Sequence, residues 1–167
     1  FTLQYEMSYT NILNMLDMSG ITIRASERGE DEPIIMAGGP CAYNPEPLYD
    51  IVDFFEIGEG EEMMDDVLEV YARHKANGKV NKKEFLREIS HIGGIYVPSL
   101  YDVSYNEDGT IREFTPKYED VPAKVKKRIV NNFDKVSFPD EMIVPYTDIV
   151  HDRVVLETAR GCTNGCR

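Results

Sequence analysis

Basic residues, cysteines and long apolar runs are all scarce in this 167-residue sequence. Lysine and arginine number 18 against 30 aspartates and glutamates, so the formal net charge is −12. Because nucleic acids are bound mainly by clustered Lys and Arg, we expect no direct DNA binding. Three cysteines are too few for the disulfide framework of a small secreted domain. No apolar run approaches the roughly 20 residues that cross a bilayer, and there is no signal-peptide pattern. We therefore expect a cytoplasmic protein without a membrane association.

The charges that are present are unevenly distributed. Every charged residue between positions 46 and 69 is acidic. The one basic cluster, Lys124, Lys126, Lys127 and Arg128, has no interleaved aromatic residues, which favours a solvated face over a nucleic-acid site. An apolar fraction of 42% and a charged fraction of 29% are those of an ordinary globular protein. The length suits one domain with its own core.

The first 92 residues alternate between helical and strand-like patterns. The runs "IIMAGG" and "DFFEI" are short and continuously apolar, which is typical of parallel strands covered on both faces. The segment "EEMMDDVLEVYARHKANG" has acids in its first turns, bases in its last turn and a closing Gly78, as expected of a helix. The predicted elements are helix 8–20, strand 21–25, strand 34–39, a short helix 45–52, strand 53–57, helix 61–78 and helix 81–92. This order predicts an open α/β sheet.

The pattern changes after residue 93. Two alternating runs joined by a turn that contains Gly109 predict a β-hairpin over residues 100–115. Residues 123–130 are ambiguous between helix and strand, and we favour a strand. Residues 138–152 are interrupted by two prolines and predict an extended crossover, and an apolar strand is expected from Arg153 to Thr158. The predicted organisation is an α/β domain 1–92, a β-rich linker 93–152 and a further unit that starts at 153.

Two glycine-rich turns follow the two predicted buried strands. One is Gly38-Gly39-Pro40 and the other is Gly58-Glu59-Gly60-Glu61. In open α/β sheets ligands bind beyond the carboxyl ends of the strands, where glycine lets a ligand approach the backbone. Each motif alone is more often just a tight turn, but on consecutive strands the two loops would be neighbours in space. The carboxylates of the second loop disfavour a simple phosphate site.

The histidines and cysteines leave more than one interpretation open. His74 lies in the last turn of a predicted helix, where the helix dipole favours it structurally, and His91 is expected to be structural or exposed. Cys162 and Cys166 are metal ligands by type, but two thiolates complete no common site. Together with His151 they would offer three ligands for zinc.

The context of the cysteine pair resembles a known motif. "ETARGCTNGCR" looks like the start of the C-x3-C-x2-C signature of the radical S-adenosylmethionine (SAM) superfamily, with the third cysteine expected three residues after Cys166. The segment "PIIMAGGPCAYNPEPLYDIVDFFEIGEGEE" is similar to the cobalamin-binding-like domain of one large branch of that superfamily. There, a glycine pair ends one strand, an acidic residue (here Asp53) opens the next, and a Gly-Glu-Gly-Glu turn follows. By this resemblance residues 1–167 would be an N-terminal fragment that ends inside the motif.

The resemblance implies a fold and a chemistry. The fold would be a flavodoxin-like (cobalamin-binding-like) open parallel sheet, a β-hairpin linker and, over residues 153–167, the first strand of a truncated barrel. Cys162 and Cys166 would be ligands of a [4Fe–4S] cluster that cleaves SAM reductively to a 5′-deoxyadenosyl radical, with an electron supplied by a protein such as flavodoxin or ferredoxin. The fragment alone would be inactive, and the substrate, whether a small molecule or a macromolecule, is not indicated.

Two further interpretations stay open beside this one. Members of the superfamily that bind cobalamin through histidine carry an Asp-x-His-x-x-Gly motif, and this chain contains none. The loops at residues 38–40 and 58–61 would then hold a cobalamin tail, another ligand, or only an inherited backbone shape. The alternative function is a non-catalytic α/β ligand-binding module in which the two cysteines are incidental.

Overall fold

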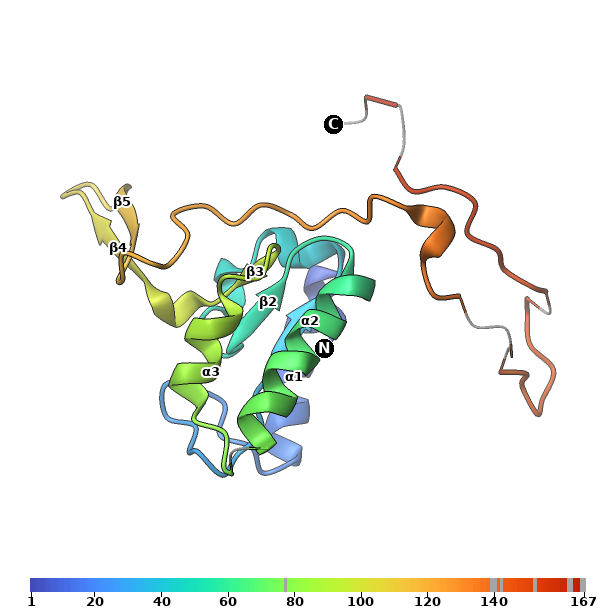
Figure 1. The fold of residues 1–167 in the computed structure, drawn as a ribbon, viewed down its shortest axis with the longest axis horizontal. Helices are drawn as coiled ribbons and strands as arrows, with labels where there is room; N and C mark the ends of the chain where they lie inside the picture. Colours follow the sequence, from blue (N-terminus) through green and yellow to red (C-terminus); the bar gives the residue numbers. More distant parts are fainter. Residues whose placement is uncertain (77, 139–140, 142, 152, 162–163, 166–167) are drawn as a thin grey trace. The chain divides into compact units, whose positions relative to one another are not determined.

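The computed structural model of the chain describes residues 1–76, 78–138, 141, 143–151, 153–161 and 164–165. The chain divides into two compact units, Phe1–Val136 and Ser137–Arg167. The first unit contains every helix and strand of the described residues (Figure 1). No helix in this described part is long and apolar enough to cross a membrane.

The first unit is built on a small mixed sheet with the strand order β1-β2-β3. Strands β1 (Met36–Gly38) and β2 (Phe54–Glu56) are parallel, whereas β3 (Ile95–Tyr96) runs antiparallel to β2. The two apolar runs of the sequence therefore form the predicted parallel pair. The prediction of an entirely parallel sheet is wrong, because β3 pairs antiparallel with β2. This strand has only two residues, which is too short for a hydrophobic pattern to reveal it in the sequence.

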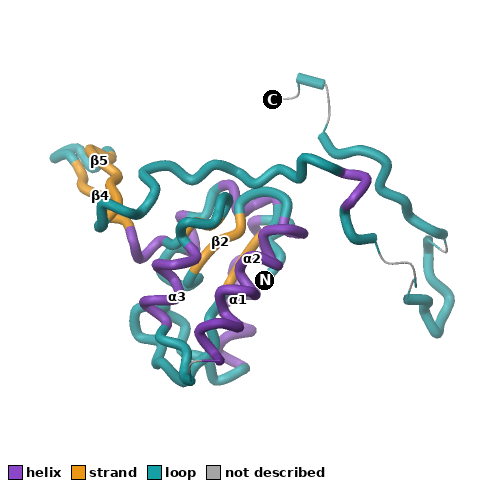
Figure 2. Tube along the Cα trace, in the orientation of Figure 1, coloured by secondary structure: helices purple, strands orange, loops and turns teal. Residues whose placement is uncertain are grey.

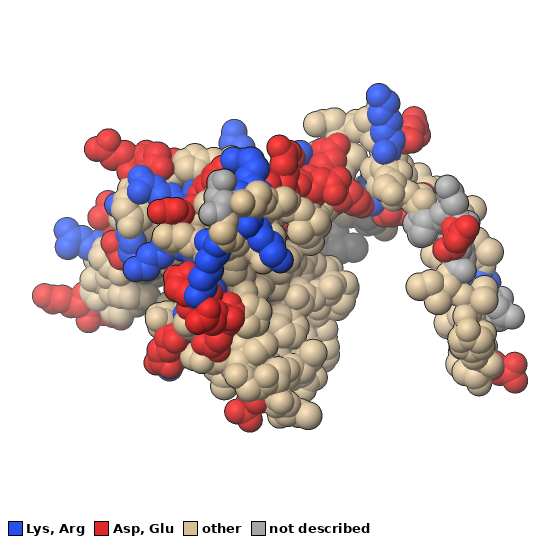
Figure 3. Space-filling view, turned by 60° about the horizontal axis from the view of Figure 1, so that its bottom comes forward, with Lys and Arg blue, Asp and Glu red and all other residues tan. Residues whose placement is uncertain are grey.

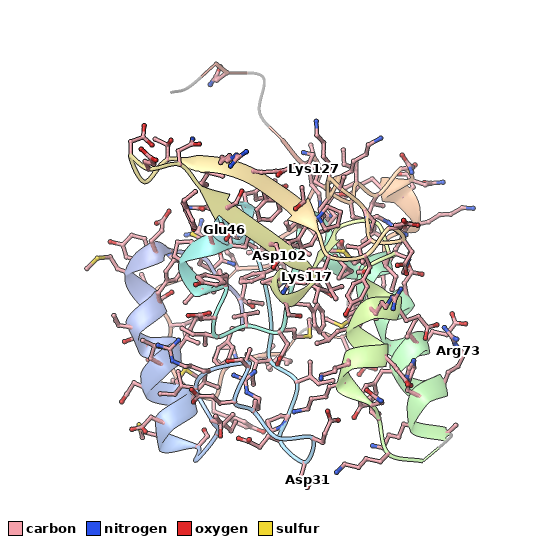
Figure 4. The ribbon with its side chains drawn as sticks, turned by 90° about the vertical axis from the view of Figure 1, so that its left-hand side faces the viewer. Asp31, Glu46, Arg73, Asp102, Lys117 and Lys127 are labelled. Carbon is pink, nitrogen blue, oxygen red and sulfur yellow. The ribbon has the colours of Figure 1, made fainter. Side chains whose placement is uncertain are left out.

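Helices cover both faces of this sheet. Figures 1 and 4 show α1 on one side of the sheet and α2 and α3 on the other. Phe54 packs against Phe85 of α3 with ring centroids 6.4 Å apart, and Phe55 stacks on Tyr96 at 6.1 Å. Successive residues of a strand point to opposite faces, so these two phenylalanines anchor the two halves of the core.

The helices lie close to their predicted positions. They are α1 (Tyr9–Met18), α2 (Gly60–Ala76) and α3 (Lys82–Ile89), with short 3-10 turns at Pro40–Tyr43 and Glu46–Leu48. The side chain of Asn81 caps α3 by accepting hydrogen bonds from the backbone N–H groups of Lys83 and Glu84. The predicted helix over residues 45–52 is reduced to the second 3-10 turn.

The predicted strand at residues 21–25 does not form. The guanidinium of Arg28 donates to the carbonyl oxygens of Thr22 at 3.0 Å and Ile23 at 2.9 Å. Those carbonyls are therefore paired with a side chain instead of a neighbouring strand, and the segment becomes a turn.

The predicted hairpin is confirmed, and the rest of the chain is less regular. Strands β4 (Tyr101–Tyr105) and β5 (Ile111–Pro116) pair antiparallel, and Gly109 has φ +80° in the turn between them. Figure 2 shows loop in the described residues that follow the short 3-10 turn Phe133–Lys135. The predicted barrel strand at Arg153 to Thr158 is not formed, and no closed barrel is present among the described residues. Val154, Val155 and Leu156 are 66–73% exposed, and the described part of residues 137–167 offers this segment no strand with which to pair.

Candidate functional site at the carboxyl edge of the sheet

The two glycine loops lie side by side at one edge of the sheet. The parallel register of β1 and β2 places Gly38 opposite Glu56, so the loops that follow the two strands are neighbours. The 3-10 turn after the first loop starts at Pro40, and α2 starts at Gly60 with Glu61 in its first turn. The sequence predicted this juxtaposition, and the structure places both loops there.

The first loop is packed against the N-terminal segment of the same chain. The backbone N–H of Leu3 donates to the carbonyl of Gly38 at 2.6 Å, and the N–H of Cys41 donates to the carbonyl of Leu3 at 2.9 Å. Gly39 has φ +103°, and a Cβ atom there would lie 3.0 Å from the Leu3 oxygen. The close backbone approach that glycine permits is therefore made by the chain itself.

The second loop is packed against a segment that follows the hairpin. A parallel bridge joins Gly58 to Arg128, with the Arg128 N–H donating to Ile57 at 2.9 Å and the Glu59 N–H donating to Arg128 at 3.1 Å. Gly58 has φ +120°, and a Cβ atom there would lie 2.2 Å from the Arg128 oxygen. No side chain larger than hydrogen fits at this position without moving the Arg128 backbone. We call residues 124–130 the linker strap.

The linker strap also carries charge to this edge. The Arg128 guanidinium lies 3.2 Å from a carboxylate oxygen of Glu62 and 3.2 Å from one of Asp66, both on α2. The N–H of Val130 donates to a carboxylate oxygen of Glu59 at 2.5 Å. The other basic residues of the cluster are exposed, as predicted, whereas Arg128 is half-buried and partly neutralises the acidic start of α2.

One acidic residue of this edge was missed by the sequence analysis. Glu56 is only 7% exposed, and its Oε1 atom is buried without a hydrogen-bond partner among the described residues. Its other oxygen lies 3.7 Å from the place of a Cβ on Gly38 and 3.6 Å from that on Gly60. Burial raises the pKa of Glu56, and the Phe1 ammonium opposes this shift. The signal in the sequence was a glutamate inside the otherwise apolar run "FFEI".

Replacement of Glu56 by glutamine is expected to stabilise the protein at neutral pH by about 1 kcal/mol. A carboxyl group with a raised pKa in the folded state binds its proton more tightly there than in the unfolded chain. The free energy of unfolding of the parent protein should therefore fall as the pH rises from the usual value of 4.5 through the higher pKa of the folded state. Urea denaturation between pH 4 and 8 would measure this slope, which should be smaller in Glu56→Gln.

The matched control for this experiment is Glu69→Gln. Glu69 is an exposed carboxylate on α2, so its replacement removes the same charge without changing a buried group. If the two variants had the same pH dependence of stability, the claim that the buried Glu56 carboxylate destabilises the folded protein would be contradicted.

The described contacts of the three histidines are structural. The Nε2 atom of His74 lies 2.7 Å from a carboxylate oxygen of Glu88, which joins α2 to α3. His91 contacts the carbonyl of Glu88 through Nδ1 at 3.2 Å. His151 pairs through Nδ1 with Arg153 at 2.9 Å. The structural role predicted for His74 is consistent with this pairing.

The predicted metal ligands Cys162 and Cys166 lie outside the described residues. Within the part of the chain that is described, no group of three or more His, Cys, Asp and Glu side chains is close enough to hold a metal ion. By donor chemistry the two thiolates suit an iron–sulfur cluster, because such clusters are held by soft sulfur ligands. Zinc binding by Cys162, Cys166 and His151 stays a prediction, because the two cysteines lie outside the described residues.

The two glycine loops leave little room for a cobalamin tail at the backbone of Gly39 and Gly58. The glycine positions that would let a cofactor tail approach the backbone are filled by the backbones of Leu3 and Arg128. Cobalamin binding at these loops stays a prediction.

Comparison with known proteins gives one match. The family described as "Radical SAM proteins, N-terminal" matches residues 1–98, which is more than half of the chain. No curated protein and no solved structure matches it. The matched region covers α1 to α3, all three strands of the mixed sheet and both glycine loops.

Proposed function

Because the chain belongs to the radical SAM family through its N-terminal domain, we propose that its parent protein is an enzyme that cleaves SAM reductively at a [4Fe–4S] cluster. Family membership carries this proposal, and the order "ETARGCTNGC" beyond the matched region supports it.

In this proposal Cys162 and Cys166 hold two irons of the cluster as thiolates. A third thiolate would complete the set, and the bound cluster would supply one-electron reduction of SAM to a 5′-deoxyadenosyl radical. A tight loop suits this task because Gly161 has φ +89°, which turns the backbone directly before Cys162. A reductant protein of the flavodoxin or ferredoxin kind would deliver the electron.

Residues 1–136 have a supporting task in this proposal. The linker strap is paired with the β2 edge through Arg128, and it precedes the segment that leads to the cysteines. Backbone pairing at Gly58 and the ion pairs with Glu62 and Asp66 fix the residue from which that segment departs. We propose that the N-terminal domain acts as a scaffold for the chain that enters the catalytic region.

The test is electron paramagnetic resonance of the full-length protein after anaerobic reconstitution with iron and sulfide. The reduced protein is expected to give a [4Fe–4S]⁺ signal that shifts when SAM is added, because SAM binds at the iron that no protein ligand occupies. Cys162→Ala and Cys166→Ala should each abolish the signal, whereas Cys41→Ala, at the half-buried cysteine of the first loop, should retain it.

Other outcomes distinguish the alternatives. A protein that binds no cluster but binds zinc, and loses it in His151→Ala, would support the zinc site instead. A protein that binds neither metal would contradict the proposal and leave a non-catalytic α/β module.

A further inference from the structure

A cavity of about 680 Å³ lies on the side of the sheet that α2 and α3 cover. Its apolar wall is formed by Met36 and Phe54 of the parallel strands, Val67 and Tyr71 of α2 and Phe85 of α3. Binding sites for small molecules are typically concave, apolar and about 300–1,000 Å³ in volume, with a few polar groups that orient the ligand. This cavity has the size and the wall of such a site, and it is separate from the glycine loops.

One polar group of this wall is a buried lysine. Lys82, the first residue of α3, is only 8% exposed and lines the cavity. Its ammonium group donates a short hydrogen bond to the carbonyl of Gly29. No carboxylate oxygen of the described residues lies within 4 Å of it, although Asp31, Glu32 and Asp53 interact with it electrostatically at longer range. Buried charges in proteins are normally paired, so two N–H groups of a buried cation remain available for an anion.

The acidic side chains around the cavity are already engaged, and one of them, Glu30, accepts the backbone N–H of Lys82 at 3.3 Å. Asp31, at the end of the body away from the hairpin (Figure 4), pairs with Lys79. The carboxylate of Glu32 accepts the backbone N–H groups of Thr22 and Gly29, both at 2.7 Å. Figure 3 shows acidic and basic side chains gathered together beside a broad surface without either. Each acid at the mouth therefore has a hydrogen-bond or ion-pair partner of its own, and none of them lies within 4 Å of the Lys82 ammonium.

We propose that this cavity binds a small molecule with an apolar body and one anionic headgroup, and that Lys82 pairs with the headgroup. The apolar body lies along the half-buried Met36 and against Phe54 and Val67 of the same wall. A carboxylate or sulfonate headgroup accepts the N–H groups of Lys82 that do not donate to Gly29, and it comes closer to the ammonium than any carboxylate of the described residues. This inference is independent of the cluster chemistry and assigns a ligand site to the N-terminal domain itself.

Lys82 also borders a second cavity of about 570 Å³. That cavity extends to the hairpin, and its wall mixes the acids Glu46, Asp50 and Asp53 with the bases Arg28, Lys83 and Lys117. The first cavity is the better fit for an amphiphilic anion because of its apolar wall, and Leu68, which lines only this cavity, distinguishes the two.

The experiment is calorimetric titration of the 167-residue chain with decanoate below its micelle concentration, and with decanol as the uncharged analogue. We expect decanoate to bind with a Kd on the order of 100 μM. Lys82→Met keeps approximately the length of the side chain and removes its charge. It should weaken the binding of decanoate at least about tenfold and leave the affinity for decanol unchanged. Lys83→Met is the matched control, because Lys83 is the exposed neighbour of Lys82. This variant should bind decanoate with the same affinity as the parent protein.

A second variant keeps the proposal testable if Lys82→Met does not fold, as judged by circular dichroism. Leu68 is 53% exposed at the cavity, so Leu68→Glu should be tolerated and should place a repelling carboxylate beside the ligand. The Leu68→Glu substitution should weaken the binding of decanoate more than the binding of decanol. The proposal is overturned if decanoate does not bind, if decanol binds as tightly as decanoate to the parent, or if neither variant discriminates between the two.

Discussion

Replacement of Asp53 by asparagine is expected to lower the free energy of unfolding by about 3–5 kcal/mol. The Asp53 carboxylate lies at the start of β2, 2.6 Å from the guanidinium of Arg28, whose side chain is completely buried. The same carboxylate oxygen accepts the backbone N–H of Ile35 at 2.6 Å. Removal of this charge leaves a buried guanidinium without its counter-charge. The free-energy cost of that unpaired charge is larger than the stabilisation that the intact pair provides.

The pair does more than join two side chains. Besides Thr22 and Ile23, the Arg28 guanidinium donates to the carbonyl of Ile51 at 2.9 Å. It therefore connects the turn over residues 21–25 to the segment that enters β2, while Asp53 connects β2 to the residue that precedes β1. We expect Asp53→Asn to loosen the amino ends of both parallel strands together.

The control is Asp50→Asn, measured by the same urea denaturation of the 167-residue chain. Asp50 pairs with Arg24 at 2.9 Å, but these side chains are 48% and 58% exposed. Exposed ion pairs contribute about 0–1 kcal/mol, so this variant should be close to the parent. Equal effects of the two substitutions would contradict a special role for the buried pair.

The parts of this fold that could be predicted are those with a local signal. The strands at Met36–Gly38 and Phe54–Glu56 were predicted because short continuous apolar runs end at glycine turns. The hairpin was predicted because its two alternating runs flank a turn with Gly109. In each case the residues that determine the element are close in the sequence, and even the hairpin extends only from Tyr101 to Pro116.

The parts that could not be predicted depend on distant partners. The Arg28–Asp53 pair spans 25 positions, and nothing in "RASERGE" distinguishes Arg28 from an exposed arginine. The glycine loops were identified as sites of close approach, but their partners Leu3 and Arg128 could not be inferred from sequence spacing. Family resemblance located the cysteine motif, which composition and periodicity alone left as one of several metal interpretations.

Replacement of Gly58 by alanine is the other change with a large expected effect, a loss of about 3 kcal/mol of stability. The substitution combines backbone strain at φ +120° with a Cβ atom 2.2 Å from the Arg128 oxygen. The alanine variant can relieve this overlap only if the linker strap moves away from the sheet edge. We therefore expect the bonds from Arg128 to Ile57 and from Glu59 to Arg128 to break.

Hydrogen exchange separates this mechanism from strain alone. The amide hydrogens of Glu59 and Arg128 should exchange faster in Gly58→Ala, and the peptide bonds after Lys126 and Lys127 should become more sensitive to trypsin. Gly78→Ala is the matched control, since Gly78 has φ +121° and nothing within 4 Å of its Cβ position. It carries the same backbone strain without the collision and should cost about 1–2 kcal/mol while leaving the linker strap protected. If both variants were destabilised equally and the Arg128 amide stayed protected in both, the linker strap would not be held at the sheet edge by the close approach at Gly58, and the scaffold role proposed for the N-terminal domain would lose its structural basis.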